Sequence, residues 1–331
     1  MNRFVLVGTG KDYVKYVWQS VVSRDDVQWF DRPFLTSNAV LYNICHLHSS
    51  FLLNKFFSLP FKSLWRKFYS IENATIKGED RYFIILFDNT LCRYSPKSIS
   101  KFKIEHPNAV LVLFMDNAMY KKERLVLSHL KNVDLVYTNN KYDAEKYGFK
   151  YVFNIIPPQQ EQLEYKPDYD VVFVGNAYDR LNIIHAVYDR LESIGLRIKM
   201  YVSGTRVRRK DRRKEIVYNR NLNYNEVIDL YNRSGCLLEV VGEKPTMLTM
   251  RTMEALIRNK KLITNHPFIK EQSFYDSRYI RFFKDENDLD ADFFTKNQIV
   301  EYNFVNDYTP EKFLERVLTD YSLSCSEEKN V

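Results

Sequence analysis

Cysteine is scarce in this 331-residue chain, and its few cysteines lie far apart. They are Cys45, Cys92, Cys236 and Cys325. None forms a Cys-x-x-Cys pair and no histidines cluster with them, whereas zinc ligands usually come in close pairs. The spacing indicates buried or free thiols in a reducing compartment.

Long hydrophobic runs and nucleotide-loop signatures are also lacking. The mean hydropathy is −0.41, and no apolar run is long enough to span a bilayer. The first residues, MNRFVLVGTG, lack the apolar core of a secretory signal, so we expect a cytoplasmic protein. No Walker A sequence is present, which disfavours an ATPase. The GTGKD at 8–12 is not a Gly-x-Gly-x-x-Gly motif, which disfavours a dinucleotide oxidoreductase.

The composition favours a globular protein with anionic partners. Hydrophobic residues make up 45% of the chain and the formal net charge is +7. This mild excess suits nucleotide diphosphates or acidic lipid headgroups, and it falls short of the basicity of a dedicated nucleic-acid binder. We therefore expect no nucleic-acid partner.

The strand pattern predicts two α/β domains. Short, continuous apolar runs alternate with helical stretches, which is typical of parallel strands buried on both faces. In the first half these runs are 4–8, 82–89, 109–117 and 133–140. A joint rich in proline and polar residues follows at 155–170, and the pattern then restarts with 170–176. We predict two Rossmann-like, doubly wound parallel-sheet domains at 1–157 and 168–305, followed by a C-terminal helix and tail at 306–331.

The stretch at 246–259 is the most informative predicted helix. Arg251 and Glu254 lie three residues apart, away from an apolar stripe. Ligands bind at the carboxyl ends of parallel strands, where helix N-termini favour anions. Arg251 would suit phosphate oxygens, and Glu254 could accept hydrogen bonds from ribose hydroxyls. An exposed Arg–Glu helix pair is the alternative.

A family resemblance supports the ligand-binding interpretation. The stretch LTMRTMEALIRNKKLITN resembles the donor-site signature of GT-B glycosyltransferases, in particular bacterial surface-polysaccharide transferases (capsule and lipopolysaccharide) and spore-maturation-type relatives. VDLVYTNNKYDAEKYG and DVVFVGNAYDR resemble the end of their first domain and the start of their second. The resemblance implies a GT-B-like fold with two domains facing a central cleft.

The same resemblance assigns donor-binding residues. Glu254 would hold the donor ribose and Arg251 the diphosphate. Independently of the resemblance, further donor-binding candidates lie just after the predicted strands or near the start of the helix, and a plain tight turn is the alternative for the two glycine positions. They are Thr249, Lys244, Glu243, Gly175, Asn176 and Gly204. Many retaining GT-B enzymes carry a second Glu eight residues before the first, but Thr246 stands there, which leaves the stereochemistry open.

The catalytic base of an inverting transfer should come from the first domain. Asp116 and Asp88 each follow a predicted buried strand. We favour Asp116 over Asp88, although either could simply cap the next helix. His46 and His48 are alternatives.

A basic, aromatic stretch at 51–70 suggests a peripheral contact with the inner face of the cell membrane. A core helix whose lysines reach back to solvent is the alternative. The candidate membrane or acceptor residues are Lys55, Lys62, Trp65, Arg66 and Lys67.

Together these features predict a glycosyltransferase that moves a sugar from a UDP- or GDP-sugar to a hydroxyl of a glycan or lipid-linked acceptor in surface polysaccharide biosynthesis. We expect no cofactor and no metal, because lysine, arginine and a helix N-terminus can neutralise the leaving diphosphate. The alternatives are another double-Rossmann enzyme, such as a sugar epimerase or an oxidoreductase, and a noncatalytic protein that binds nucleotides or polyanions.

Overall fold

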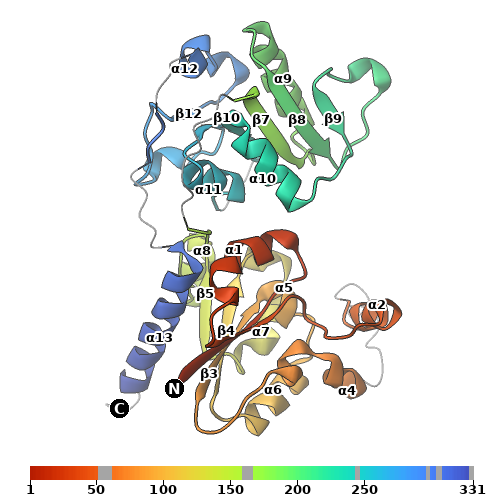
Figure 1. Cartoon of the computed structure of the whole chain (residues 1–331), viewed down its shortest axis with the longest axis vertical. Helices are drawn as coiled ribbons and strands as arrows, with labels where there is room; N and C mark the ends of the chain where they lie inside the picture. Colours follow the sequence, from red (N-terminus) through yellow and green to blue (C-terminus); the bar gives the residue numbers. More distant parts are fainter. Residues whose placement is uncertain (51–61, 159–166, 243–246, 296–298, 303–307, 328–331) are drawn as a thin grey trace. The chain divides into compact units, whose positions relative to one another are not determined.

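The computed structural model describes residues 1–50, 62–158, 167–242, 247–295, 299–302 and 308–327. The chain divides into two compact units (Figure 1). Unit 1 comprises Met1–Pro157 together with Asp307–Val331, and unit 2 comprises Pro158–Asn306. Each unit is built around its own parallel β-sheet.

Unit 1 contains a six-stranded sheet in the order β2-β1-β3-β4-β5-β6, and every neighbouring pair is parallel. Its strands are β1 (Asn2–Val7), β2 (Val27–Phe30), β3 (Arg81–Phe87), β4 (Ala109–Met115), β5 (Leu135–Thr138) and β6 (Lys150–Tyr151). All seven residues of β4 are buried. The continuous apolar runs of the sequence are therefore inner strands with both faces covered.

The described helices of unit 1 lie between these strands in the chain, except for the last one. They are α1 (Asp12–Val22), α2 (Ala39–His48), α4 (Lys62–Trp65), α5 (Asp88–Leu91), α6 (Pro96–Glu105), α7 (Glu123–Leu130), α8 (Lys141–Tyr147) and α13 (Pro310–Glu327). Several boundaries follow from local chemistry. The Ser95 side chain accepts a hydrogen bond from the Ser98 amide at the start of α6, and proline follows at the first helical position. Gly148 ends α8 with a φ of 70°, a conformation that glycine adopts without strain.

The C-terminal helix α13 belongs to unit 1, although it follows unit 2 in the chain (Figure 1). Phe313 packs edge-on against Trp18 of α1 and near Tyr137 of β5, with ring centroids 5.8 Å and 5.0 Å away. The Tyr137 hydroxyl also donates a 2.8 Å hydrogen bond to Asp320. The helix therefore covers one face of the unit 1 sheet with aromatic contacts.

Unit 2 contains a second six-stranded parallel sheet, in the order β12-β11-β10-β7-β8-β9. Its strands are β7 (Tyr169–Asn176), β8 (Ile198–Ser203), β9 (Ile216–Tyr218), β10 (Ser234–Glu239), β11 (Lys261–Thr264) and β12 (Ile280–Phe282). Its helices are α9 (Leu181–Ser193), α10 (Tyr224–Asn232), α11 (Met250–Ile257) and α12 (Ala291–Thr295). The first strand of the unit, β7, lies beside the fourth, β10, which is the strand order of dinucleotide-binding folds.

The predicted fold class, an α/β chain with two parallel sheets, is confirmed. One helix boundary is wrong: the helix predicted from 246 begins at Met250, because the Thr249 side chain caps it by accepting from the Arg251 amide. No helix among the residues that the structure describes combines the length and apolar character needed to cross a membrane.

Candidate functional site

The carboxyl edge of the unit 2 sheet holds a group of polar residues where the strand order reverses. Parallel α/β sheets bind ligands at this point, because the connections of two neighbouring strands leave in opposite directions. In unit 2 the two strands are β7 and β10. β7 ends at Asn176 and β10 ends at Glu239.

Arg180 links the ends of these two strands. It is the residue before α9, and its guanidinium donates 2.6 Å to the Asn176 carbonyl and 2.5 Å to the Val240 carbonyl. One side chain thereby ties the end of β7 to the residue that follows β10. Arg180 was not among the predicted site residues, because its position before a helix gives no sign of this contact.

Arg251, a predicted donor residue, lies at the same place. It is the second residue of α11, and its guanidinium donates to the Val174 carbonyl near the end of β7. The guanidinium carbon is 4.6 Å from the centre of the Phe173 ring, which positions the charge by a cation–π contact. Within the described residues, the buried Arg251 Nε has no hydrogen-bond acceptor.

The two arginines carry positive charge that no carboxylate of the described residues pairs with directly. Within the described parts of the chain, neither Arg180 nor Arg251 has an Asp or Glu oxygen within ion-pair distance. Partial burial lowers the pKa of Arg180, and repulsion from Arg251 lowers that pKa further. Two neighbouring cations in a half-buried place are stabilised by a bound anion.

The predicted residues Gly175, Asn176 and Gly204 also meet at this edge. Asn176 on β7 pairs with Ser203 on β8, and the Ser203 hydroxyl donates 2.9 Å to the Asn176 side-chain oxygen. Gly204 follows with a φ of +70°, and a Cβ there would stand 2.6 Å from that same oxygen. The absence of a side chain at Gly204 therefore keeps Asn176 in place.

Gly204→Ala should destabilise unit 2 and disturb the site together. Alanine disfavours positive φ, and its methyl group would displace the Asn176 amide. We expect a loss of about 1–2 kcal/mol in the free energy of unfolding, measured by urea denaturation. Gly195→Ala is the matched control, because Gly195 has a φ of +78° and an added Cβ there meets nothing within 4 Å. If the two variants lose equal stability, the contact with Asn176 contributes nothing.

Glu239, which was not among the predicted site residues, is a buried carboxylate at this edge. It is fully buried at the end of β10. Its oxygens accept hydrogen bonds from the hydroxyls of Thr249, Thr252 and Thr264, at 2.8 Å from Thr252 and 2.5 Å from Thr264. Glu239 thus anchors the start of α11, including the predicted donor residue Thr249, to the ends of β10 and β11. A run of apolar residues with one Glu gave no sign of this role.

Glu254 occupies a different environment from the one expected of an exposed helix pair. Glu254 is 1% exposed, and it accepts a 2.7 Å hydrogen bond from Arg258, which is 4% exposed. The Tyr224 hydroxyl of α10 donates to the other carboxylate oxygen. The alternative of an exposed pair with Arg251 is therefore wrong, since the partner is Arg258 and the pair is buried. The assignment of Glu254 to the donor ribose stays a prediction.

Glu254→Gln should lower stability measurably. The change removes the charge that pairs with buried Arg258 while keeping the shape of the side chain. Leaving that cation without its counterion should cost about 1.5–3 kcal/mol in the free energy of unfolding. Chemical denaturation measures the loss. The exposed pair Lys312–Glu315 offers a control, in which Glu315→Gln should cost no more than about 1 kcal/mol.

The two candidate catalytic carboxylates come together at the carboxyl edge of the unit 1 sheet. Asp88 directly follows β3 and Asp116 directly follows β4. Phe87 pairs with Phe114 across these neighbouring strands, so the two carboxylates leave the sheet within one residue of register. Both therefore stand where parallel sheets place functional groups.

Asp116 has the electrostatics expected of a base. Burial raises its pKa to about 6, a hydrogen bond from the Tyr13 hydroxyl opposes that shift, and the nearby charge of Asp88 adds to it. A base with a pKa near 6 is unprotonated at neutral pH and still accepts a proton readily.

Asp88 has more polar partners among the described residues than Asp116 has. It is fully buried, forms a 2.9 Å ion pair with Lys122, and accepts from the Asn117 side chain at 3.1 Å and 3.2 Å. Lys122 also donates to Asn89. With its oxygens engaged, Asp88 is better suited to positioning Lys122 and Asn117 than to accepting a proton. The alternatives His46 and His48 lie instead on α2, where His48 is 5.0 Å from the Trp65 ring.

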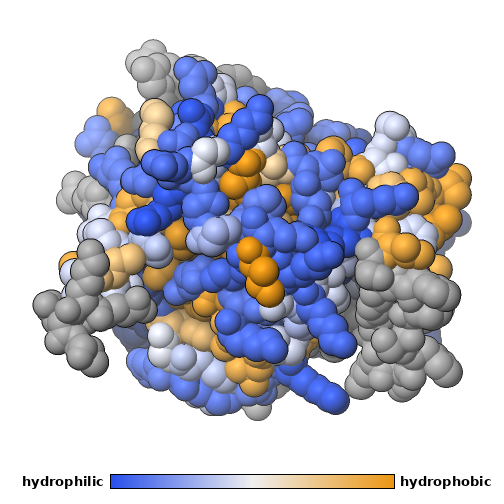
Figure 2. All heavy atoms as spheres, turned by 90° about the horizontal axis from the view of Figure 1, so that it is seen from below, coloured by the Kyte–Doolittle hydropathy of each residue, from blue (hydrophilic) through white to orange (hydrophobic). Residues whose placement is uncertain are grey.

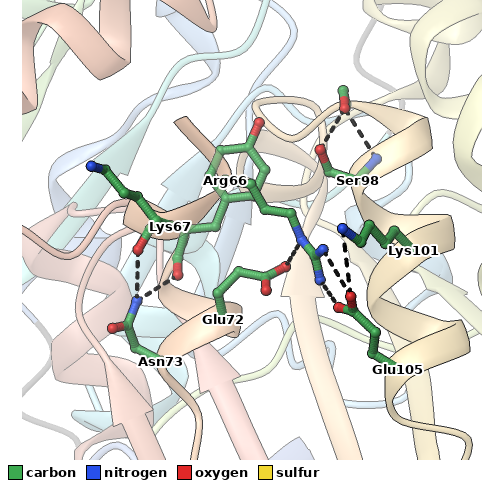
Figure 3. A network of polar contacts seen from close by, with 9 residues as sticks. Arg66, Lys67, Glu72, Asn73, Ser98, Lys101 and Glu105 are labelled. Atoms are coloured by element: carbon green, nitrogen blue, oxygen red, sulfur yellow. Dashed lines mark hydrogen bonds and ion pairs between the residues drawn. The ribbon is translucent and has the colours of Figure 1, made fainter. Parts of the chain in front are cut away.

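The predicted membrane residues divide between the interior and the surface. Lys62 and Trp65 bound the short helix α4, and Trp65 packs against the unit 1 core. The Arg66 side chain is 12% exposed and forms ion pairs with Glu72 and Glu105, as Figure 3 shows. Lys67 is exposed. Arg66 thus links its own segment to α6 inside unit 1.

Three predicted site residues lie outside the described residues. They are Lys55, Glu243 and Lys244. Their assigned roles stay predictions.

Two aspartates that lie close together in the sequence could suggest a metal site, but both form ion pairs with arginines. In the triplet Asp168-Tyr169-Asp170, Asp168 pairs with Arg233 and Asp170 with Arg197, at the amino end of β7. Among the described residues, no group of three His, Cys, Asp or Glu side chains is arranged to hold a metal ion.

No protein-family model and no curated protein sequence matches the chain. Solved structures do resemble it. The Glycosylation Associate Protein (Gap123) complex from Streptococcus agalactiae shares 13% identity at a TM-score of 0.48, over 78% of this chain and 58% of that one. An alpha-glucosyltransferase in complex with UDP and DNA shares 10% identity at a TM-score of 0.46, over 80% and 79% of the two chains.

A UDP-GlcNAc 2-epimerase from Neisseria meningitidis, bound to UDP-GlcNAc, shares 9% identity at a TM-score of 0.49. The match covers 98% of this chain and 100% of that one. The chain spans little more than half of the Gap123 chain that it matches. At these identities and TM-scores, the similarity assigns the chain neither to a family nor to one of these activities.

Proposed function

We propose that the chain is a glycosyltransferase that uses a UDP- or GDP-sugar and acts on a hydroxyl of a glycan or lipid-linked acceptor in surface polysaccharide biosynthesis. Unit 2 binds the nucleotide diphosphate. Unit 1 supplies the base.

The observation that carries this proposal is the pair Arg180 and Arg251 at the point where the unit 2 strand order reverses. The diphosphate lies against these guanidinium groups, close to Gly175 and the start of α11. Arginine suits this role because its planar fork matches phosphate oxygens. The helix N-terminus adds partial positive charge.

In an inverting transfer, Asp116 accepts the proton of the acceptor hydroxyl. The acceptor oxygen forms a bond to the anomeric carbon, and the bond between that carbon and the diphosphate oxygen breaks. The leaving nucleoside diphosphate takes the electron pair, and Arg180 and Arg251 stabilise its added charge. Lys122, held by Asp88, adds positive charge near the base.

Titration calorimetry with UDP, GDP and NAD tests the donor assignment. We expect UDP or GDP to bind with micromolar affinity and to raise the melting temperature, because a ligand of the native state stabilises it. NAD binding without a response to either nucleotide would assign the chain to the dinucleotide enzymes instead. Incubation with UDP-GlcNAc alone, followed by analysis of the sugar product, separates transferase from epimerase, since an epimerase changes the sugar without an acceptor.

Turnover should survive EDTA. Arginine side chains and a helix N-terminus already neutralise the diphosphate in this proposal. Comparison of initial rates with and without chelator measures the effect, and Mn²⁺ or Mg²⁺ should give no more than about twofold stimulation. A rate abolished by EDTA and restored by either cation would contradict the proposed role of the arginines.

A further inference from the structure

Helix α2 of unit 1 is apolar on two opposite faces. One face packs against the core through Leu41, Tyr42 and buried Cys45. The other carries Val40, Ile44 and Leu47, which are 68%, 41% and 58% exposed. This spacing of four and three residues aligns them in one stripe along the helix. A surface helix normally exposes polar residues to water, so we expect this outer apolar stripe to bind a partner.

Neighbouring residues extend the apolar surface. Leu35, shortly before α2, is 50% exposed, and Leu64 of α4 is 64% exposed. In the space-filling view, hydrophobic side chains gather on the right, the side on which α2 lies in Figure 1 (Figure 2). We define the α2 surface as Leu35, Val40, Ile44, Leu47 and Leu64.

The stretch of chain that carries the α2 surface has charged side chains of one sign. From Arg32 to Ile71 the sequence contains no Asp or Glu, although the chain has 42 of them. The same forty residues include exposed Arg32 and exposed Lys67. A stretch that combines an apolar stripe with cations and has no carboxylate of its own is complementary to a lipid bilayer, which has an apolar interior and anionic headgroups.

We propose that the α2 surface docks the protein onto an anionic lipid bilayer. The helix lies in the plane of the interface, with Val40, Ile44 and Leu47 among the acyl chains and Lys67 at the headgroups. This differs from the docking predicted for 51–70, because Trp65 and Arg66 are committed to contacts within unit 1. Docking also deepens the proposed function, because it would bring unit 1 to the membrane that holds a lipid-linked acceptor. Only this statement about the acceptor rests on the proposed function.

A bilayer explains the surface better than a protein partner or a second copy. A protein interface of this composition would usually carry charges of both signs around its rim, to fix orientation. The stripe also uses short aliphatic side chains, whereas interface anchors are mostly Trp, Tyr and Arg.

Vesicle co-sedimentation tests the proposal. The wild-type protein should partition onto vesicles that contain phosphatidylglycerol, and more weakly onto phosphatidylcholine alone. Val40→Glu/Leu47→Glu should weaken partitioning by about tenfold or more, because it places two charges among the acyl chains. Lys67→Ala should weaken it by about fivefold on anionic vesicles only. Val40→Trp should retain binding.

Leu323→Glu is the matched control, since Leu323 is a 55% exposed apolar residue on α13. It should partition as the wild type does. Unchanged partitioning of Val40→Glu/Leu47→Glu, or no binding by the wild type, overturns the proposal. A wild-type dimer in light scattering that the double variant dissociates would assign the surface to self-association. Donor affinity should be the same in all these variants, so failure of membrane docking and failure of donor binding are separate results.

Discussion

Asp116→Asn should reduce sugar transfer by about 10²- to 10⁴-fold, the usual contribution of a positioned general base. The amide cannot accept the proton of the acceptor hydroxyl, but it keeps the size of the carboxylate. Asparagine can also keep a hydrogen bond with the Tyr13 hydroxyl, so the fold should survive. The affinity for nucleotide should stay within about twofold, because the base contributes to the chemical step rather than to uniform donor binding.

The pH dependence gives a second measurement of the same role. Burial raises the pKa of Asp116 to about 6. The base works only when deprotonated, so the rate should rise with pH through about 6 and level off above 7. Tyr13→Phe removes the hydrogen bond that lowers this pKa, and the midpoint of the profile should therefore move to higher pH.

Asp88→Asn is the comparison variant. It weakens the ion pair with Lys122, so it should lower stability as well as turnover, whereas Asp116→Asn should lower turnover alone. Melting temperatures separate the two effects. Transfer by Asp116→Asn at the wild-type rate, with a wild-type pH profile, would remove Asp116 from the mechanism.

The fold was predictable from sequence where strands are long and apolar. The runs around β3, β4 and β7 appear in the structure within a few residues of the predicted bounds. The edge strands β6 and β9 have two and three residues, and such short segments show no period of their own. The association of α13 with unit 1 depends on packing between residues far apart, such as Phe313 with Trp18.

The candidate site was predictable only in part. The ends of the predicted strands identified Asp88 and Asp116, because residues after parallel strands share one edge of a sheet. Arg251 was identified from its place near the start of a predicted helix. Arg180 and Glu239 were not predicted from the sequence. Arg180 contacts backbone carbonyls and Glu239 contacts threonine hydroxyls, and these partners lie in other elements. A spacing pattern along one helix cannot reveal such contacts.

Arg180→Ala and Arg251→Ala should each weaken nucleoside diphosphate binding by about 10- to 150-fold, the effect of losing a charge-assisted hydrogen bond worth about 1.5–3 kcal/mol. Both guanidinium groups lie where β7 and β10 part, and within the described residues neither has a carboxylate at ion-pair distance. In the proposed function, the bound diphosphate is the counterion of both arginines. Arg197→Ala is the control, because Arg197 pairs with Asp170 at the opposite end of β7 and should leave affinity unchanged.

Arg180 and Arg251 also hold backbone carbonyls, so stability must be measured beside affinity. Arg180→Lys keeps the charge but loses the fork that reaches both Asn176 and Val240. It should recover part of the affinity and little of the stability, since attraction to a diphosphate needs charge while the link between strands needs two donors. Salt dependence distinguishes the same two contributions: added KCl should weaken nucleotide binding by the wild type more than by Arg251→Ala. If all the arginine variants bind UDP and GDP as tightly as the wild type while remaining folded, the diphosphate does not bind at this edge of unit 2.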